Sequence, residues 1–350
     1  MLLHSDHIQS VLIIFWSDTF CYKHTLTESQ EYAKIIEVLT ESFQDLVSDS
    51  GYKKVHYQKI TTGEKLMDMI ENMTYDSERA LYNIRNTLVK NCRFAGPADG
   101  ESVLKETRDI IIENCSFSLR YPIWHAEKYE LRNSQLDEKT RASLWYSDDG
   151  MIENTDIRGV KALRECNNTV IRNCRIESVE FGWKTNNTKI YDSSITSEYI
   201  FLDAKNIEIT NLDFKGKYSF QYVENLIIRD SVLDTKDAFW HAKNVTVTDS
   251  VIKGEYLAWF SEGLTLIRCR IIGTQPFCYC KDLKLIDCEM EKCDLSFEYS
   301  DVKADIKGSI DSVKNPKSGR ITADSIGEII YEDSIMESKA KIITRSHDDK

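Results

Sequence analysis

The chain has 350 residues, and its 57 acidic and 45 basic side chains give a formal net charge of −12 at pH 7. Proteins that bind nucleic acid or an anionic membrane usually carry a basic stripe, and no cluster of Lys and Arg stands out along this sequence. No apolar run is long enough to cross a bilayer. We therefore expect neither nucleic acid nor a membrane as a partner.

The N-terminal segment, residues 1–76, does not follow the pattern of the rest of the chain. Residues 11–16 are apolar with no preceding Lys or Arg, so we interpret them as a buried cap segment rather than a signal sequence, and we expect a cytoplasmic protein. Apolar residues within 32–47 recur at helical spacing, and a second short helix is predicted over 66–73. We expect these helices to cap the open end of the repeat that follows.

Residues 77–335 carry a repeat of ~19 residues, which is clearest in three columns. The first apolar column is Ile157, Ile176, Ile195, Phe214, Leu233, Ile252, Ile271 and Met290. The second apolar column, which precedes the first within each copy, is Ile152, Ile171, Ile190, Ile209, Ile228, Val247, Leu266 and Leu285. A polar turn column comes before it: Asp149, Asn168, Asn187, Asn206, Asn225, Asn244, Gly263 and Asp282. A unit this short cannot bury its own apolar face, so the copies must stack.

Each unit alternates apolar and polar residues and is rich in β-branched side chains, which predicts two short strands that meet at a turn. The unit is also too short for two helices and their turns. The sequence therefore predicts an all-β protein, a right-handed single-stranded parallel β-helix with an N-terminal helical cap. Residues 336–350 are predicted to be a polar tail.

The ten cysteines mostly occupy columns of small side chains in the repeat. We interpret them as reduced, buried thiols that act as small hydrophobes. There is no Cys-x-x-Cys pair to hold zinc or an iron–sulfur cluster. We predict no metal site and no cofactor.

Several long motifs resemble a known family. Residues 234–250 read DTKDAFWHAKNVTVTDS, and related motifs occupy residues 254–259, 297–300 and 315–319. Together with shorter motifs upstream, they are similar to the domain of unknown function 3737 family over residues 77–332. The resemblance implies a pectin-lyase-like β-helix whose activity is not established. Members sometimes carry a hydrogenase label, which the absence of Cys-x-x-Cys pairs speaks against.

Five of the six tryptophans share one position of the repeat: Trp124, Trp145, Trp183, Trp240 and Trp259. An exposed column of aromatic rings could hold an extended sugar chain. The alternative is a ladder of rings inside the core, because the residue before each Trp is mostly apolar and turns can break the alternation of a strand. The sequence leaves both interpretations open.

Charged residues beside this Trp column are the candidate site residues. Arg164 lies between two Trp positions and could stack on both rings. Asp237 and Glu255 fall on neighbouring coils, where two carboxylates ~5–9 Å apart could act in glycoside hydrolysis; the alternative is an ordinary ion pair between Lys236 and Glu255. The candidate catalytic residues are therefore Asp237, Glu255, Arg164 and His241. The candidate ligand-binding residues are the five Trp, Glu165, Lys184 and Asp203, of which the last three would form an alternating ion ladder.

Two functions remain open at this stage. The first is a β-helix that binds or modifies carbohydrate along the Trp face, with a carbohydrate or a small polar ligand as its partner. If it is an enzyme, it is a carbohydrate hydrolase or lyase. The second is a non-catalytic scaffold for protein interactions. The ligand, the oligomeric state and the presence of catalysis do not follow from the sequence.

Overall fold

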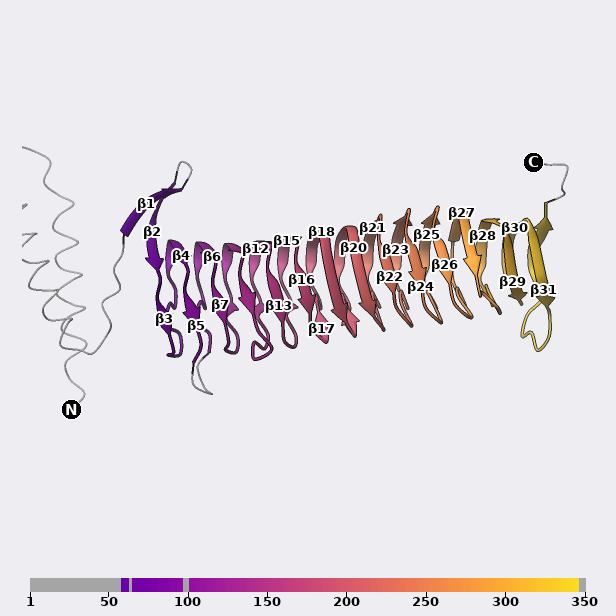
Figure 1. Cartoon of the computed structure of the whole chain (residues 1–350). Coiled ribbons are helices and arrows are strands. Elements are labelled where there is room, and N and C mark those ends of the chain that lie inside the picture. The colour runs from indigo at the N-terminus through magenta and orange to yellow at the C-terminus, as the bar shows by residue number, and fades with distance from the viewer. Residues whose placement is uncertain (1–57, 63–64, 97–100, 346–350) are drawn as a thin grey trace, which may run out of the picture. The chain divides into compact units, whose positions relative to one another are not determined.

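The computed structural model describes residues 58–62, 65–96 and 101–345, and they fold as a parallel β-solenoid (Figure 1). Successive coils stack in register: Ile171 pairs with Ile190, and Ile190 pairs with Ile209, each one repeat further along the chain. This part of the chain is built from strands and turns without a helix. Among these residues there is no helix long and apolar enough to cross a membrane.

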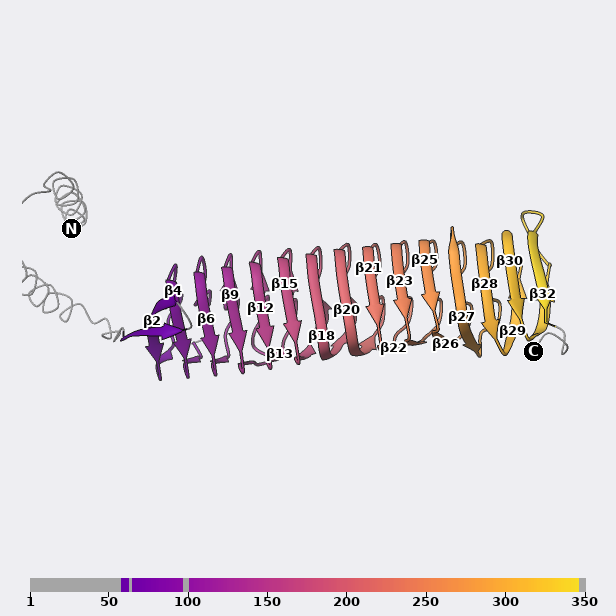
Figure 2. The same cartoon turned by 90° about the horizontal axis from the view of Figure 1, so that it is seen from above.

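Each coil has three sides, which we call A, B and C. The A strands form a continuous parallel row, which Figure 2 shows from above. They are β2 (Lys65–Glu71), β4 (Arg85–Lys90), β6 (Arg108–Glu113), β9 (Glu127–Arg132), β12 (Asp148–Glu153), β15 (Asn167–Arg172), β18 (Asn186–Ser197), β20 (Lys205–Gly216), β21 (Glu224–Arg229), β23 (Lys243–Thr248), β25 (Glu262–Ile267), β27 (Leu283–Glu291), β28 (Asp301–Lys307), β30 (Ser318–Ala323) and β32 (Lys339–Thr344).

The B strands are shorter and follow the A strands after a tight turn, except in the long strands β18, β20 and β27, which run through both sides. The remaining B strands are β3 (Thr74–Tyr75), β5 (Arg93–Phe94), β7 (Ser116–Phe117), β10 (Gln135–Leu136), β13 (Asp156–Arg158), β16 (Arg175–Glu177), β22 (Val232–Asp234), β24 (Val251–Lys253) and β26 (Arg270–Ile272), with the pair β29 (Ser309–Lys314) and β31 (Ser325–Ile330) at the C-terminal end.

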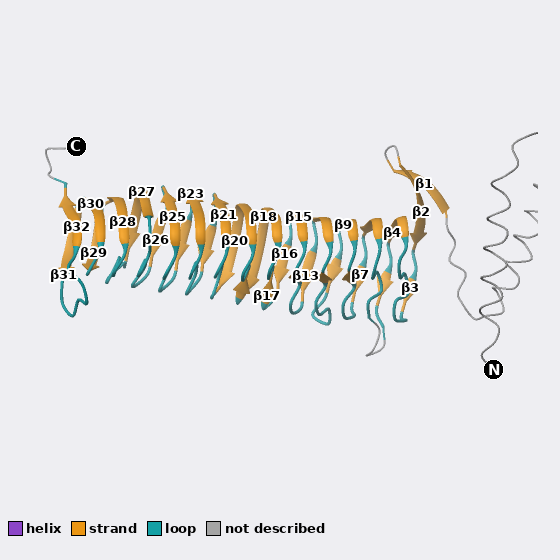
Figure 3. Ribbon diagram, turned by 180° about the vertical axis from the view of Figure 1, so that it is seen from behind, coloured by secondary structure: helices purple, strands orange, loops and turns teal. Residues whose placement is uncertain are grey.

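Side C contains little regular strand, and much of each coil outside sides A and B is drawn as loop in Figure 3. Its strands are β8 (Ile123–Trp124), β11 (Leu144–Trp145), β14 (Leu163–Arg164), β17 (Glu180–Phe181) and β19 (Tyr199–Ile200). At the other end of the described residues, β1 (Gln58–Thr62) pairs with β2 in an antiparallel hairpin.

The three sequence columns occupy the positions that the repeat predicted. Every member of the two apolar columns is buried, with exposed fractions of 0–6%. Every member of the polar turn column has positive φ, a conformation that Asn, Asp and Gly tolerate best. Side chains in this column also bond from coil to coil, as from Asn187 Nδ2 to Asn168 Oδ1 at 3.0 Å. The predicted parallel β-helix is confirmed, and its right-handedness stays a prediction.

The solenoid begins earlier and ends later than predicted. The helix predicted over 66–73 is wrong: these residues supply most of β2, and Ile70 pairs in parallel with Val89. The apolar residues Met67, Ile70 and Met73 fall three apart, which imitates a helical period. The predicted tail also contains β32, which pairs with β30 and extends the solenoid past residue 335. The predicted helix within 32–47 and the segment 11–16 lie outside the described residues.

The nine described cysteines are buried and free, as expected for a column of small side chains. Their thiols lie near backbone carbonyls; Cys269 Sγ is 3.4 Å from the oxygen of Val247. Cys92 and Cys115 lie on adjacent coils and share a hydrogen bond between their thiols. This hydrogen bond lowers the pKa of Cys92 to about 7, although burial alone would raise it. The same contact, with burial, raises the pKa of Cys115.

Candidate functional site

From Tyr218 onward, the backbone of side C alternates between left-handed and extended conformations. In one coil, Tyr256, Ala258 and Phe260 have positive φ, whereas the residues between them do not. The N–H of Ala258 donates to Ala238 of the preceding coil, and that of Phe260 donates to Cys278 of the following coil. Because the backbone is not a regular strand, neighbouring side chains need not point to opposite faces. Trp259 is half-buried and Phe260 is exposed.

The Trp column lies at the boundary between core and solvent. The residue before the Trp is buried, for example Phe239 before Trp240, while the indole itself is half-buried. Four of the five indoles donate from Nε1 to a backbone carbonyl of the next coil, at 2.7–3.1 Å: Trp145 to Lys161, Trp183 to Tyr199, Trp240 to Tyr256 and Trp259 to Gln275. The column is therefore neither a core ladder nor a free platform. These four indoles each bond their own coil to the next one.

One ring face of each of four indoles is covered by a neighbour. Trp240 and Trp259 stack with centroids 5.3 Å apart and planes 5° apart. The guanidinium of Arg164 lies 5.1 Å from the centroid of the Trp145 ring and 5.6 Å from that of Trp183. Stacking of Arg164 on both rings is therefore as the sequence predicted. A sugar ring cannot stack on a face that another side chain occupies.

The ion ladder predicted for Glu165, Lys184 and Asp203 does not form. Glu165 turns back to Arg164, with Oε1 3.3 Å from Nε. Within the part of the chain that the structure describes, Lys184 makes no ion pair with either acidic residue. The three residues do follow one another on adjacent coils, so the predicted register of the coils is confirmed. The predicted ion pairs between their side chains are wrong.

The column next to the Trp residues carries a solvent-facing row of stacked aromatic rings, which we call the outer ladder. Its members are Tyr222, His241, Phe260, Tyr279 and Tyr299, and consecutive centroids lie 4.7–5.5 Å apart. Tyr222 is 53% exposed and Phe260 is 45% exposed, whereas Tyr279 and Tyr299 are half-buried. From Tyr222 to Tyr279 the rings stack face to face, so the row presents ring edges and an imidazole to solvent. The hydroxyls of Tyr222 and Tyr279 have no hydrogen-bond partner among the described residues.

Sequence analysis missed the outer ladder as a unit. Tyr222 and Phe260 stand in the same column as His241, but charged residues fill that column on the earlier coils and interrupt the aromatic pattern. Tyr279 and Tyr299 follow Phe260 at steps of about one repeat, and the periodicity alone could have found them. A shorter ladder on earlier coils pairs His125 with Tyr146 at 5.1 Å.

Asp237 is the one candidate carboxylate with an unusual environment. It is buried, with 7% exposure, and occupies the same side C position as Tyr218 and Tyr256 on the two neighbouring coils. Burial raises the pKa of Asp237; the charge of Lys236 opposes this and the charge of Glu255 adds to it. A carboxyl group in such a place is suited to exchange a proton or to accept a hydrogen bond.

Two other acidic residues on side C, Glu255 and Glu298, are paired. Glu255 Oε2 lies 2.9 Å from Lys236 Nζ, the ion pair that the sequence offered as the alternative to catalysis. Glu298, which fills the Trp position beside Tyr299, is buried and lies 3.0 Å from Lys314 Nζ. This contact raises the pKa of Lys314.

The structure brings together only part of the predicted catalytic set. Asp237 and His241 share a coil, and Glu255 lies on the next one. Arg164 lies four coils earlier, ~19 Å away at the usual strand spacing, and cannot act on the same bond. No group of three His, Cys, Asp or Glu in the described ranges is arranged to hold a metal ion.

One family of proteins matches most of the chain. The sequence profile of the family described as Protein of unknown function (DUF3737) matches residues 68–344. No curated protein matches the sequence.

Among solved structures, the A-module of an Azotobacter vinelandii mannuronan C-5 epimerase is 11% identical, with a TM-score of 0.41 over 79% of this chain and 88% of its own. The surface adhesin PfbA of Streptococcus pneumoniae is 9% identical, with a TM-score of 0.32 over 69% of this chain and 75% of its own. The catalytic domain of a GH87 α-1,3-glucanase, solved with nigerose, is 10% identical, with a TM-score of 0.28 over 80% of this chain and 63% of its own. The likeness to these proteins concerns the stacking of coils, and none of their activities transfers to this chain.

Proposed function

The chain belongs to the family described as Protein of unknown function (DUF3737), and we propose that it binds an extended carbohydrate chain along the outer ladder of side C. One observation supports this most: five aromatic side chains lie in register on successive coils and face solvent in whole or in part. A contiguous apolar surface on a folded protein usually marks a ligand or partner site.

The chemistry of the outer ladder matches a glycan. Stacked rings present a narrow apolar strip to which sugar C–H groups can pack. Along the strip, the hydroxyls of Tyr222 and Tyr279 and the imidazole of His241 can exchange hydrogen bonds with sugar hydroxyls. The strip repeats once per coil, every ~4.8 Å, so a regular polymer can make the same contact repeatedly.

In this proposal the Trp column supports the ladder from behind and does not stack on sugar. Trp240 and Trp259 are fixed by hydrogen bonds from their indole N–H groups to backbone carbonyls, and their rings contact each other. Trp259 also touches Phe260 and Tyr279 edge to face. A rigid second row of this kind limits the motion of the exposed rings and lowers the entropy cost of binding.

Modification of the bound glycan is a second function, and the environment of Asp237 is the observation that favours it. A carboxyl group whose pKa is raised by burial can act as a general acid. If it does, Asp237→Asn abolishes turnover of a bound oligosaccharide and leaves its affinity unchanged. A variant that loses binding instead would assign Asp237 to the binding surface.

A glycan array on the wild-type protein, followed by calorimetry with the glycans that bind, tests the main proposal. The variant Phe260→Ala/Tyr279→Ala removes two adjacent rings of the outer ladder and should lose binding. The matched control, Tyr82→Ala, removes an aromatic ring that is 49% exposed and lies outside the ladder, and it should bind like the wild type. Failure of every glycan to bind the wild type, or equal binding by the ladder variant, would contradict the proposal. Specific capture of a protein by the same surface would favour the scaffold function.

A further inference from the structure

Four cationic side chains form a row on side A at the C-terminal end of the solenoid, which we call the basic row. Lys284 pairs with Lys303, Lys303 with Arg320, and Arg320 with Lys341, on β27, β28, β30 and β32. All four residues occupy the same outward-facing position of successive A strands. The backbones of neighbouring members therefore lie one strand spacing, ~4.8 Å, apart.

The same column is mixed on all earlier coils. It reads Glu130, Met151, Val170, Lys189, Glu208, Ile227, Thr246 and Thr265 before it reaches the basic row. The one earlier cation among these, Lys189, faces Glu208, with the charged atoms 3.4 Å apart. Opposite charges on adjacent strands stabilise a sheet, whereas like charges directly opposite destabilise it. The basic row therefore departs from the rule that the rest of the column follows.

Nearby acidic groups do not explain the basic row. Lys284 pairs with Asp282, with Nζ and Oδ2 3.0 Å apart. Among the described residues, Lys303 and Lys341 make no ion pair, and the guanidinium of Arg320 donates only to Thr322 Oγ1 at 3.3 Å. Three neighbouring cations thus keep hydrogen-bond donors free for a ligand.

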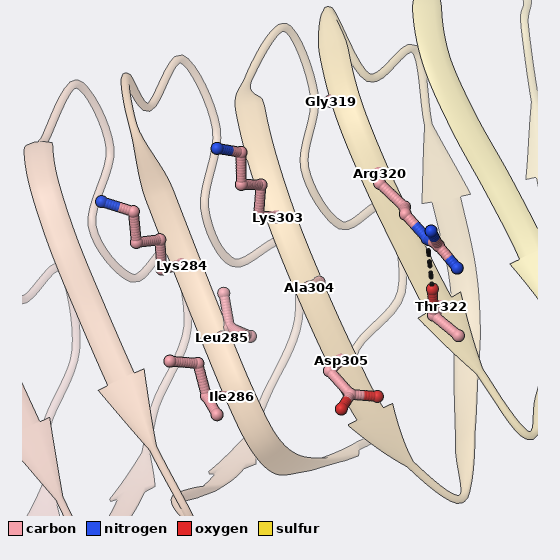
Figure 4. Close-up of a pocket in the computed structure, with 9 residues that line it drawn as sticks. All are labelled: Lys284, Leu285, Ile286, Lys303, Ala304, Asp305, Gly319, Arg320 and Thr322. Carbon is pink, nitrogen blue, oxygen red and sulfur yellow. Dashed lines mark hydrogen bonds between the residues drawn. The ribbon is translucent and has the colours of Figure 1, made fainter.

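Three members of the row, Lys284, Lys303 and Arg320, border an open groove of about 580 Å³, shown in Figure 4. Lys284 and Lys303 extend side by side, and the Arg320 side chain is turned toward Thr322. Ile286, which is 44% exposed, contributes apolar surface to the groove, and Asp305 lies along it on the side away from the lysine ammonium groups. The groove thus combines cations along one edge with an apolar surface next to them.

We propose that this groove binds a linear acidic polysaccharide, with its carboxylate or sulfate groups on the basic row. An extended pyranose unit advances by about one strand spacing, so a polymer with one anionic group per sugar meets successive cations in register. The C–H groups of the sugars would pack on Ile286, the exposed apolar side chain of the groove. Duplex DNA presents a phosphate about every 3.4 Å along each strand, which matches the ~4.8 Å spacing of the basic row less well. The net charge of −12 also repels a polyanion whose charges do not meet the cations of the row in register.

The basic row lies on side A and the outer ladder on side C, so this inference does not depend on the proposed function. The test measures binding of a linear oligogalacturonate to the wild-type chain at low and moderate salt. A neutral cello-oligosaccharide of the same length and duplex DNA serve as comparison ligands. We expect the oligogalacturonate to bind more tightly than either, with an affinity that falls as salt is added.

The variant Lys303→Gln/Arg320→Gln removes the centre of the basic row and should weaken oligogalacturonate binding by about tenfold or more, because charge-assisted hydrogen bonds are lost. The matched control is Lys205→Gln/Lys243→Gln, which also removes two positive charges from side A. These two lysines lie on either side of Glu224 on the adjacent strands and outside the basic row, so the control should bind like the wild type. The melting temperature of the row variant should not fall, because the substitutions relieve repulsion between like charges. If the melting temperature does fall, the binding test is repeated with the single variant Lys303→Gln.

Any of three results would overturn the inference. They are no binding of oligogalacturonate to the wild type at low salt, equal loss of binding in both double variants, and binding of DNA that is as tight and depends on the same two residues. The variant Phe260→Ala/Tyr279→Ala is expected to keep oligogalacturonate binding, so failure of the proposed function on side C is recognised separately.

Discussion

Replacing Trp240 with Ala tests whether the Trp column bonds the coils together. The indole donates to the carbonyl of Tyr256 at 2.7 Å and stacks on Trp259 at 5.3 Å. A fully buried Trp→Ala change costs ~3–5 kcal/mol. For a half-buried ring we expect about half of that, ~2 kcal/mol, and the lost hydrogen bond adds ~1 kcal/mol. The free energy of opening this coil should therefore fall by about 3 kcal/mol.

Two further variants separate the contributions. Trp240→Phe keeps a ring in the stack and loses the N–H donor, so it should cost ~1 kcal/mol. Phe260→Ala removes an exposed ring of the outer ladder and should also cost only ~1 kcal/mol, from its stacking contacts. The predicted order of destabilisation is Trp240→Ala first, with the other two well below it.

Hydrogen exchange is the assay of choice, because a long stack of repeats need not unfold in one step. The free energy of opening is read from amides in the same and the neighbouring coil, such as those of Tyr256 and His241, whose N–H groups donate to the following coil. If Trp240→Ala opens no more readily than Phe260→Ala, the indole does not hold the coils together and the reasoning is wrong.

Three other predictions concern the core and the carboxyl of Asp237. Gly150→Ala should lower stability by ~1–3 kcal/mol in thermal or chemical denaturation, since the new Cβ would lie 2.3 Å from the ring of Tyr129; an unchanged midpoint would refute the packing. Because burial raises the pKa of Asp237 in the folded state, its ionisation costs stability near neutral pH, and that stability returns as pH falls through the folded-state pKa. Asp237→Asn should therefore be at least as stable as the wild type at neutral pH, with the difference shrinking in acid, and a clear loss at neutral pH would contradict this. The nine buried cysteines should react slowly with iodoacetamide in the native state, with Cys92 the first among them because its pKa is lowest; rapid native labelling of Cys166 or Cys280 would show that the core opens.

Most of the fold followed from the sequence because a single period governs it. Residues one repeat apart, such as Ile171 and Ile190, are direct neighbours in the sheet. The first coil escaped notice although Asn72 and Asn91 are also one repeat apart and both turn with positive φ. The spacing of Met67 and Ile70 also fits a helix and conceals the repeat at this position.

The environment of the Trp column could not be predicted from alternation. Alternation assumes extended backbone, and on the coils of side C from Tyr218 onward every second residue is left-handed, as at Tyr256 and Ala258. The ends of each indole also make different contacts: one edge of Trp259 bonds to Gln275, while the ring touches the exposed Phe260. A half-buried ring of this kind has no distinct pattern in a sequence.

The basic row shows a second limit of reading the chain in order. Its members lie one to a coil, far apart along the chain, so no local cluster of charge appears and the sequence was interpreted as lacking a basic stripe. Only the pairing of Lys303 with Arg320, and of Arg320 with Lys341, places the charges side by side. Charge patterns in a solenoid are therefore visible only after the register is known.

The central claim, that a glycan lies on the outer ladder, can be tested directly through His241. Selective labelling of the histidine imidazoles gives one resonance for each of the seven His, and His241→Gln assigns the one of interest. His125, in the shorter ladder six coils away, is an internal control at ~29 Å. The account predicts that a glycan selected on the array shifts the resonance of His241 and leaves that of His125 in place. A bound glycan that shifts only His125, or neither resonance, would contradict it.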